Sequence, residues 1–242
     1  MSEPSEPVAL TRVASELTRD LELDSPPVGI SYLDQPLAGT ERLEQAAPSV
    51  CTYFAQGRSR SFQVAQRLHE ECEIGAFVLG EKPEGAWGER LKTTLKSMEE
   101  EGYLLPGEAG SIPHNPQAPE WVSYAPLGAG PGEVSAALLF VRARALMYVL
   151  ETAHRLGGLW SPPPMVLRPM CSLVPLLRQG KPLAISVGCA GSRIYTEMGD
   201  GEMVVGLRGD ALRSFHRELR RIRAANEAVR EENQRRKDRS GN

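Results

Sequence analysis

The 242-residue sequence has no segment that marks it for export or for a membrane. Its first ten residues, MSEPSEPVAL, are acidic and lack the apolar core of a signal peptide. Its longest apolar stretch, 134–141, is far shorter than the ~20 residues that span a bilayer. We therefore expect a cytoplasmic protein without a membrane span, in a compartment where thiols stay reduced.

The sequence also lacks the short motifs of the common enzyme classes. It contains no phosphate-binding loop, no dinucleotide-binding fingerprint and no Ser/His/Asp arrangement. The glycine-rich stretch 128–132 includes a proline and precedes a predicted strand, which does not fit a phosphate loop that opens a helix. No motif of this kind identifies a reaction.

There is no overall excess of positive charge, since the formal net charge is −3. The segment from Arg208 onward is nevertheless basic, with eleven Lys and Arg against six Asp and Glu. Such a helix is compatible with contact to nucleic acid or acidic lipid. The simpler interpretation is a solvated face that pairs with its own body or with a second copy of the chain, as in a homo-oligomer. We do not expect nucleic-acid binding.

Hydrophobic residues make up 41% and charged residues 24% of the chain, as in a globular protein with a sizeable core. Predicted helices alternate with predicted strands, which indicates a single layered α/β (or α+β) domain with a mixed sheet and a long C-terminal helix. We expect this domain to cover residues 1–229 and residues 230–242 to form a charged, frayed tail. The predicted strands are 28–33, 72–80, 121–127, 135–141, 183–187 and 203–207. The predicted helices are 8–21, 61–69, 87–101, 143–156, 171–179 and a final one from about Asp210, with a loop at 188–192.

The four cysteines occur in two similar settings. Cys51 begins a helix-like stretch and Cys72 follows 21 residues later, close to Gly75. Cys171 begins a similar stretch, and Cys189 follows 18 residues later between two glycines. The segments 49–80 and 169–197 are therefore candidates for a degenerate internal duplication, which would bring the four sulfur atoms together.

Four cysteines in a reducing compartment suggest metal binding, redox chemistry or simple burial. Four thiolates could ligate an iron–sulfur cluster, with glycines at 75, 188 and 191 letting backbone N–H groups approach the sulfur atoms. Arg58 and Arg193 could stabilise thiolates by their charge. No two cysteines have the close spacing of zinc knuckles or ferredoxins. The alternative is four buried, reduced cysteines that act as small hydrophobic residues.

Other polar and aromatic side chains are further candidates for the same site. His69 lies three residues before Cys72, where it would be a ligand, a donor to a ligand, a proton carrier or an ordinary surface histidine. Four aromatic residues could line an organic-ligand pocket or belong to the core, namely Tyr103, Tyr124, Trp160 and Tyr195.

From about residue 27 to residue 226 the sequence resembles the uncharacterised prokaryotic family called domain of unknown function 169. The resemblance is carried by Cys51 with 54–55, His69 with 72–76, 102–103, 124–127, 168–171, 186–193 with 195–196, and 225–226. All four cysteines match cysteine positions of the family, which supports a shared site. Glu73 stands where the family more often has proline, and a carboxylate there would alter the charge around a cluster.

Two functions follow from these observations. The first is a redox or cofactor-binding protein with an iron–sulfur cluster on Cys51, Cys72, Cys171 and Cys189, with Arg193 and His69 nearby, that works with a small molecule or an electron-transfer partner. The second is a non-enzymatic small-molecule-binding or accessory protein in which the cysteines are only buried.

Overall fold

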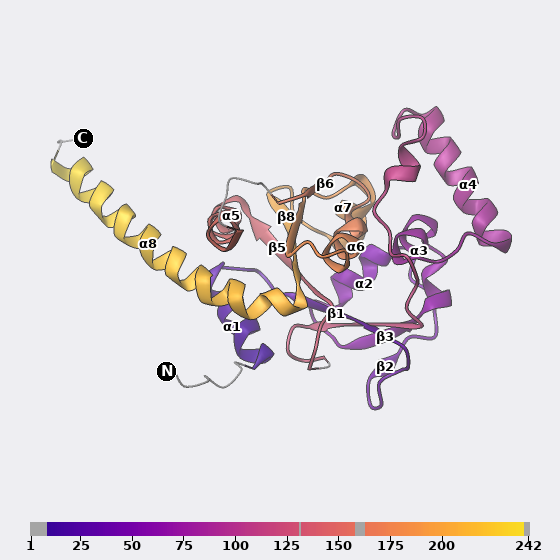
Figure 1. Cartoon of the computed structure of the whole chain (residues 1–242), viewed down its shortest axis with the longest axis horizontal. Helices are drawn as coiled ribbons and strands as arrows, with labels where there is room; N and C mark the ends of the chain where they lie inside the picture. The colour runs from indigo at the N-terminus through magenta and orange to yellow at the C-terminus, as the bar shows by residue number, and fades with distance from the viewer. Residues whose placement is uncertain (1–8, 131, 158–162, 240–242) are drawn as a thin grey trace.

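One open sheet of eight strands forms the centre of the protein (Figure 1). The structure is a computed structural model that describes residues 9–130, 132–157 and 163–239. The strands lie in the order β2-β3-β4-β1-β5-β8-β7-β6, and only the β2–β3 and β6–β7 pairs are parallel. They are β1 (Val28–Leu33), β2 (Glu41–Arg42), β3 (Phe62–Ala65), β4 (Trp121–Pro126), β5 (Ala136–Arg142), β6 (Met165–Val166), β7 (Leu183–Ser186) and β8 (Glu202–Arg208).

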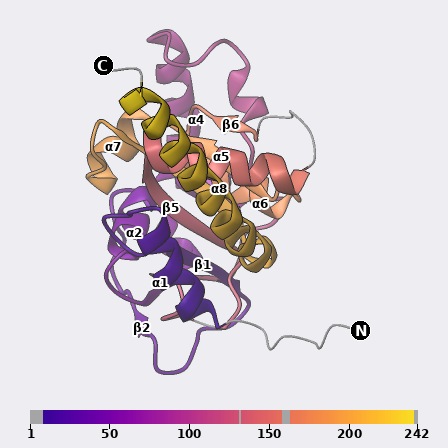
Figure 2. The same ribbon diagram turned by 90° about the vertical axis from the view of Figure 1, so that its left-hand side faces the viewer.

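Helices cover both faces of this sheet (Figures 1 and 2). The α-helices are α1 (Leu10–Asp20), α2 (Val50–Gln56), α3 (Glu73–Leu79), α4 (Gly85–Glu100), α5 (Ala143–Gly157), α6 (Leu173–Arg178), α7 (Ala190–Thr196) and α8 (Leu212–Arg239). Short 3₁₀ turns are η1 (Gln66–His69), η2 (Glu108–Ser111), η3 (Met170–Ser172) and η4 (Gly209–Ala211). In the described part of the chain, no helix is both long and apolar enough to cross a membrane.

The core is divided by the sheet into two layers. Strand β5 shows why, because its residues alternate between the layers with the period of two that a strand imposes. Ala136, Leu138 and Phe140 face the core beneath α2, α3 and α6. Ala137, Leu139 and Val141 face the core beneath α1, α5 and α8. The predicted layered α/β domain with a mixed sheet and a long C-terminal helix is therefore confirmed.

The sheet consists of two halves with the same order of elements. The N-terminal half (residues 28–126) runs β1, β2, α2, β3, α3, β4, and the C-terminal half (residues 136–208) runs β5, β6, η3-α6, β7, α7, β8, with α5 between β5 and β6. The strand order is symmetric about the β1–β5 pair, so β2, β3 and β4 correspond to β6, β7 and β8. The segments 49–80 and 169–197 occupy equivalent places in this arrangement.

The N-terminal half contains an insertion that has no counterpart in the other half. Residues 80–120, which include α4 and η2, separate α3 from β4, whereas only residues 197–201 separate α7 from β8. The insertion packs on α3 through a small apolar cluster of Trp87 and Leu91 with Ala76. In Figure 1, α4 lies at the opposite end of the molecule from the free end of α8.

Two of the secondary-structure predictions near Cys72 were wrong. Residues 61–69, predicted as a helix, form strand β3 and the turn η1. Residues 72–80, predicted as a strand, contain helix α3. Helix α3 is buried on several sides because it lies against both the core and α4. A short run that is apolar apart from Glu73 cannot distinguish a strand from a buried helix.

The predictions at residues 188–192 and for the tail were also wrong. Helix α7 begins at Ala190, inside the predicted loop, and α8 continues to Arg239 instead of fraying after residue 229. The distal part of α8 is polar on all sides and carries ion pairs one turn apart, including those of Glu232 with Arg235 and Arg236. Such pairs support a solvated helix without an apolar face. Residues 240–242 of the predicted tail lie outside the described residues.

Candidate cysteine site

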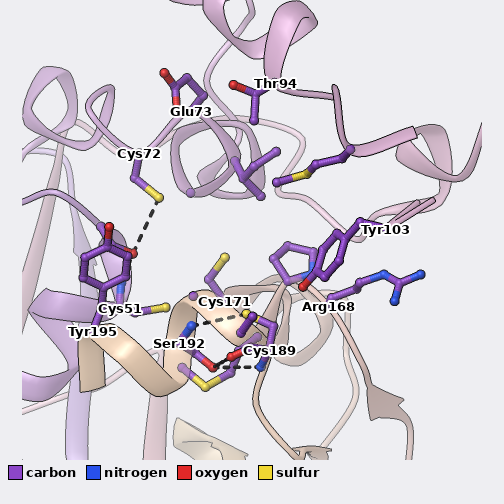
Figure 3. Close-up of a pocket in the computed structure, with 18 of the residues that line it drawn as sticks. Cys51, Cys72, Glu73, Thr94, Tyr103, Arg168, Cys171, Cys189, Ser192 and Tyr195 are labelled. Atoms are coloured by element: carbon purple, nitrogen blue, oxygen red, sulfur yellow. Dashed lines mark hydrogen bonds between the residues drawn. The ribbon is translucent and has the colours of Figure 1, made fainter. Parts of the chain in front are cut away.

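All four cysteines line one pocket (Figure 3). The pocket has a volume of about 470 Å³ and lies on the face of the sheet that α2, α3, α6 and α7 cover. Two cysteines come from the N-terminal half and two from the C-terminal half. Thiols separated by up to 138 positions in the sequence are thus brought together by the fold.

Each cysteine lies at the beginning of a helix. Cys51 is in the first turn of α2, and Cys171 is in η3, directly before α6. Cys72 and Cys189 are the residues that precede α3 and α7. The helices meet across the halves, because α2 packs against α7 and α3 packs against η3. The four cysteines therefore form two pairs of equivalent positions, Cys51 with Cys171 and Cys72 with Cys189.

Two of the sulfur atoms contact polar groups. The backbone N–H of Ser192 donates to Cys189 Sγ at 3.4 Å, and the Ser192 hydroxyl accepts from the Cys189 N–H at 2.8 Å. Cys72 Sγ lies 3.8 Å from the Ser49 hydroxyl. An N–H that points at sulfur stabilises a thiolate or a metal-bound thiolate.

Burial keeps the other two thiols protonated. It raises the pKa of Cys51 to about 12, with a further contribution from the charges that Cys189 and Cys72 would carry. Burial raises the pKa of Cys171 well above its usual value, and the other three cysteines add to the effect. Four thiolates in one pocket would repel one another, so a cation is needed before they can all be ionised.

The arrangement does not match the ligand sphere of a single metal ion. In the part of the chain that the structure describes, no group of three His, Cys, Asp or Glu side chains is placed to hold one ion. In Figure 3, Cys51, Cys171 and Cys189 lie along one side of the pocket and Cys72 stands apart from them. The four cysteines therefore line the same pocket but are scattered around it, and the described residues do not form a metal site.

The three predicted glycines have different surroundings. Gly75 and Gly191 line the pocket, whereas Gly188 is absent from its lining. A Cβ atom at Gly75 would lie 2.4 Å from Val50 Cγ2 and 2.9 Å from Cys72 Sγ, so only glycine fits there. Gly188 has a φ of +83°, a conformation that glycine adopts readily, and it turns the chain from β7 toward Cys189.

The two predicted arginines do not line the pocket. Arg193 donates to the carbonyl groups of Val187 at 2.6 Å and Gly199 at 3.1 Å, so it holds together the loops on either side of α7. Arg58 donates to the Ser25 hydroxyl at 2.7 Å and stacks over Phe140. Both have structural contacts in the described part of the chain.

His69 is buried in an aromatic cluster outside the pocket lining. Its Nε2 lies 3.1 Å from the Tyr124 hydroxyl and its Nδ1 lies 3.1 Å from the carbonyl of Gln66. Burial lowers the pKa of His69 to about 4, so the ring is neutral at pH 7. Of the predicted aromatic residues, Tyr103 and Tyr195 line the pocket, Tyr124 belongs to the core, and Trp160 lies outside the described residues.

Arg168 lines the pocket but was not predicted as a site residue, although it belongs to the segment 168–171 that carries the family resemblance. Its guanidinium lies over the Tyr103 ring, 4.7 Å from the ring centroid, and Nη2 lies 3.4 Å from Glu108 Oε2. The feature of the sequence that could have indicated a role for Arg168 in the site is its position three residues before Cys171. Its role depends on Tyr103 and Glu108, which belong to the insertion and are remote in sequence.

The comparisons with known proteins agree with the resemblance seen in the sequence. No curated protein and no solved structure matches the chain significantly. One family model, described as uncharacterised ArCR proteins of domain of unknown function 169, matches residues 16–215. This range includes all four cysteines and both halves of the sheet. Because the model covers most of the sequence, the chain belongs to the family of uncharacterised ArCR proteins with domain of unknown function 169.

Proposed function

We propose that the protein binds an iron–sulfur cluster through Cys51, Cys72, Cys171 and Cys189 and takes part in electron transfer. The observation that carries this proposal is that every cysteine of the chain lines one pocket, at equivalent positions of the two halves. Cysteines needed only as small apolar residues have no reason to meet in this way. A cytoplasmic location would keep the thiols reduced and available.

A cluster accounts for the spacing better than a single ion does. Four thiolates around zinc must each lie about 2.3 Å from the metal. Cys72 stands apart from the other three cysteines in Figure 3, and among the described residues no three metal-binding side chains converge on one point. A cluster brings its own core of iron and sulfide, so its cysteine ligands stand farther apart, and thiolates are its usual ligands.

Binding of a cluster would also remove the protons from the buried thiols. Cys51 and Cys171 have raised pKa values in the metal-free pocket because burial and neighbouring thiolates disfavour their charge. Metal cations reverse this effect, and the thiol protons leave on binding. The N–H of Ser192 that points at Cys189 Sγ would then contact a metal-bound thiolate, which lowers its charge density.

The test is to express and purify the full chain without oxygen and to measure iron, acid-labile sulfide and visible absorbance. Four single Cys→Ser variants are compared with Thr52→Ser, which alters the neighbour of Cys51 outside the pocket lining. We expect stoichiometric iron and sulfide in the wild type and in the control, and loss of most of the iron in each cysteine variant. Circular dichroism checks that every variant is folded.

A folded, colourless wild-type protein without iron or sulfide would reject the proposal. It would favour the second candidate function, a small-molecule-binding or accessory protein. The observation in favour of that candidate is the raised pKa of Cys51 and Cys171, which suits thiols that stay protonated within a core. In that case Cys189→Ser would change stability through packing alone and leave ligand affinity almost unchanged.

A further inference from the structure

The pocket extends beyond the cysteines toward the insertion of residues 80–120. This outer part has an apolar side formed by Met98, Leu104 and Ile112. Leu104 and Ile112 are buried, so their side chains are held in place by packing. Tyr103 and Arg168 form the neighbouring side (Figure 3). The outer part of the pocket therefore offers an apolar surface beside one fixed positive charge.

Arg168 has a donor that no protein group uses. Its Nε atom is buried and has no hydrogen-bond partner within the described part of the chain. The guanidinium is held by stacking on Tyr103 and by one long contact to Glu108. A buried N–H without an acceptor is unfavourable. The side chain is 33% exposed overall, so its terminal nitrogens, and not the buried Nε, are the atoms that a ligand in the pocket can reach. Guanidinium groups bind carboxylates with two parallel hydrogen bonds.

Comparison of the halves separates this charge from the cysteine site. Arg168 stands three residues before Cys171, and Pro48 stands three residues before Cys51. Both residues line the pocket, so the positive charge is present on one side only. The cysteines repeat between the halves and Arg168 does not. A group that is unique to one half fits a role in orienting a ligand.

The remaining charges of the pocket limit the ligand. Glu71, Glu73 and Glu101 also line it, and Glu73 forms an ion pair with Arg90 at 3.2 Å. In Figure 3, Glu73 lies across the pocket from Arg168. A single anionic group near Arg168 is therefore favoured, whereas a second anionic group at the far end of the ligand would meet carboxylates.

We propose that Arg168 binds the carboxylate of a small organic monoacid, whose apolar body packs against Leu104 and Ile112. The position would place the acid beside the cysteine site, so its role as a redox substrate or effector rests on the proposed function. The binding itself depends only on the pocket. It can therefore be measured on the full chain with and without bound metal.

The experiment is equilibrium dialysis with three ultraviolet-absorbing probes of similar shape: benzoate, neutral benzamide and dianionic terephthalate. Wild-type protein is compared with Arg168→Gln and with Arg178→Gln. Arg178 is a matched control because its guanidinium also stacks on a tyrosine, Tyr32, at 4.5 Å, but it does not line the pocket. Iron and sulfide are measured in each sample.

We expect the wild type to bind benzoate more tightly than benzamide or terephthalate. Arg168→Gln should weaken benzoate binding by roughly tenfold or more, as for the loss of a charged hydrogen bond, and Arg178→Gln should leave it unchanged. Equal binding of benzoate and benzamide, or an unchanged dissociation constant in Arg168→Gln, would overturn the proposal. So would displacement of bound benzoate by a lower concentration of inorganic phosphate, because the apolar side would then contribute nothing. Benzoate binding by metal-free protein would support the acid site even if the cluster proposal failed.

Discussion

The two halves of the sheet have the same topology but different polar groups around their cysteines. Cys72 is followed by Glu73, and Cys189 is followed by Ala190. The long insertion occurs only in the N-terminal half, and Arg168 occurs only in the C-terminal half. What the halves share is the set of thiols proposed to hold a cluster, and what differs is proposed to select a ligand.

The largest expected difference concerns a buried titratable residue. His69 precedes Cys72 by three residues, and the uncharged Ser186 precedes Cys189 by three. Burial lowers the pKa of His69 to about 4, whereas an unfolded chain binds this proton near pH 6.5. Between these values the unfolded state holds more protons, so the His69 contribution to stability is complete above pH 6.5 and is lost as the pH falls. The expected loss is about 3 kcal/mol by pH 4.

Urea unfolding of wild type and His69→Gln from pH 4 to 7 measures this contribution. The free-energy difference between the two proteins should increase with pH across the window and then level off. Glu81→Gln is a useful control, because burial, with the nearby charge of Glu70, raises the pKa of Glu81 to about 7 and gives the opposite pH dependence. A wild-type to His69→Gln difference that does not vary with pH would mean that His69 titrates normally.

The second prediction exchanges a residue between the halves. Gly75 corresponds to Ser192, since each lies three residues after the second cysteine of its half. In Gly75→Ser, the new Cβ would clash with Val50 and with Cys72 Sγ. We expect a loss of about 2 kcal/mol in unfolding free energy, which is typical of overpacking. Gly191→Ala is the control, because no atom lies within 4 Å of its Cβ position.

Urea unfolding curves of Gly75→Ser and Gly191→Ala measure whether a side chain at position 75 destabilises the protein more than one at position 191. If Gly75→Ser were as stable as Gly191→Ala, the N-terminal half would tolerate the side chain of the C-terminal half. The close approach of α2 and α3 would then not depend on glycine.

The third prediction concerns a substitution that removes from the start of α7 a side-chain hydrogen bond that α3 lacks. Ser192 accepts from the Cys189 N–H, whereas Cys72 has no side-chain cap at the start of α3. Ser192 is the third residue of the helix and bonds back to the N-cap residue Cys189, so Ser192→Ala removes half of a capping box and should cost about 1 kcal/mol. It should also increase amide exchange in the first turn of α7. If exchange increased equally in α3, the effect would be global and not a loss of the cap.

Helix α1 lies close to its predicted position because its apolar residues recur every three or four positions on one side. Strands β4 and β5 also lie close to their predicted positions, although β5 is apolar and buried on both faces. The similar settings of Cys51 and Cys171 correspond to equivalent positions on one pocket, whereas the predicted cluster site stays a prediction. The secondary structure of 72–80 could not be predicted, since α3 is enclosed by both the core and α4 and has no polar face.

The surroundings of Arg168 and His69 could not be predicted from the sequence, because they depend on residues that are remote along the chain. Arg168 is an ordinary charged residue by its sequence, and its setting arises from Tyr103 and Glu108 in a segment some 60 positions away. His69 was placed near the cysteines because of its spacing, but the aromatic cluster with Tyr124 holds it outside the pocket. Sequence spacing indicates nearness to a ligand, and it does not indicate the direction of a side chain.

The smallest expected effect tests how the insertion controls Arg168. Glu108 contacts Arg168 at 3.4 Å, and both side chains are about one-third exposed, at 31% and 33%. A pair as exposed as this contributes at most about 1 kcal/mol. Glu108→Gln keeps the shape and removes the competing charge, so benzoate should bind up to about fivefold more tightly. The same substitution in the Arg168→Gln background should have no effect, because the two residues act through one contact. Tighter binding in that double variant would show that Glu108 repels the acid directly, and the insertion would then influence the ligand without involving Arg168.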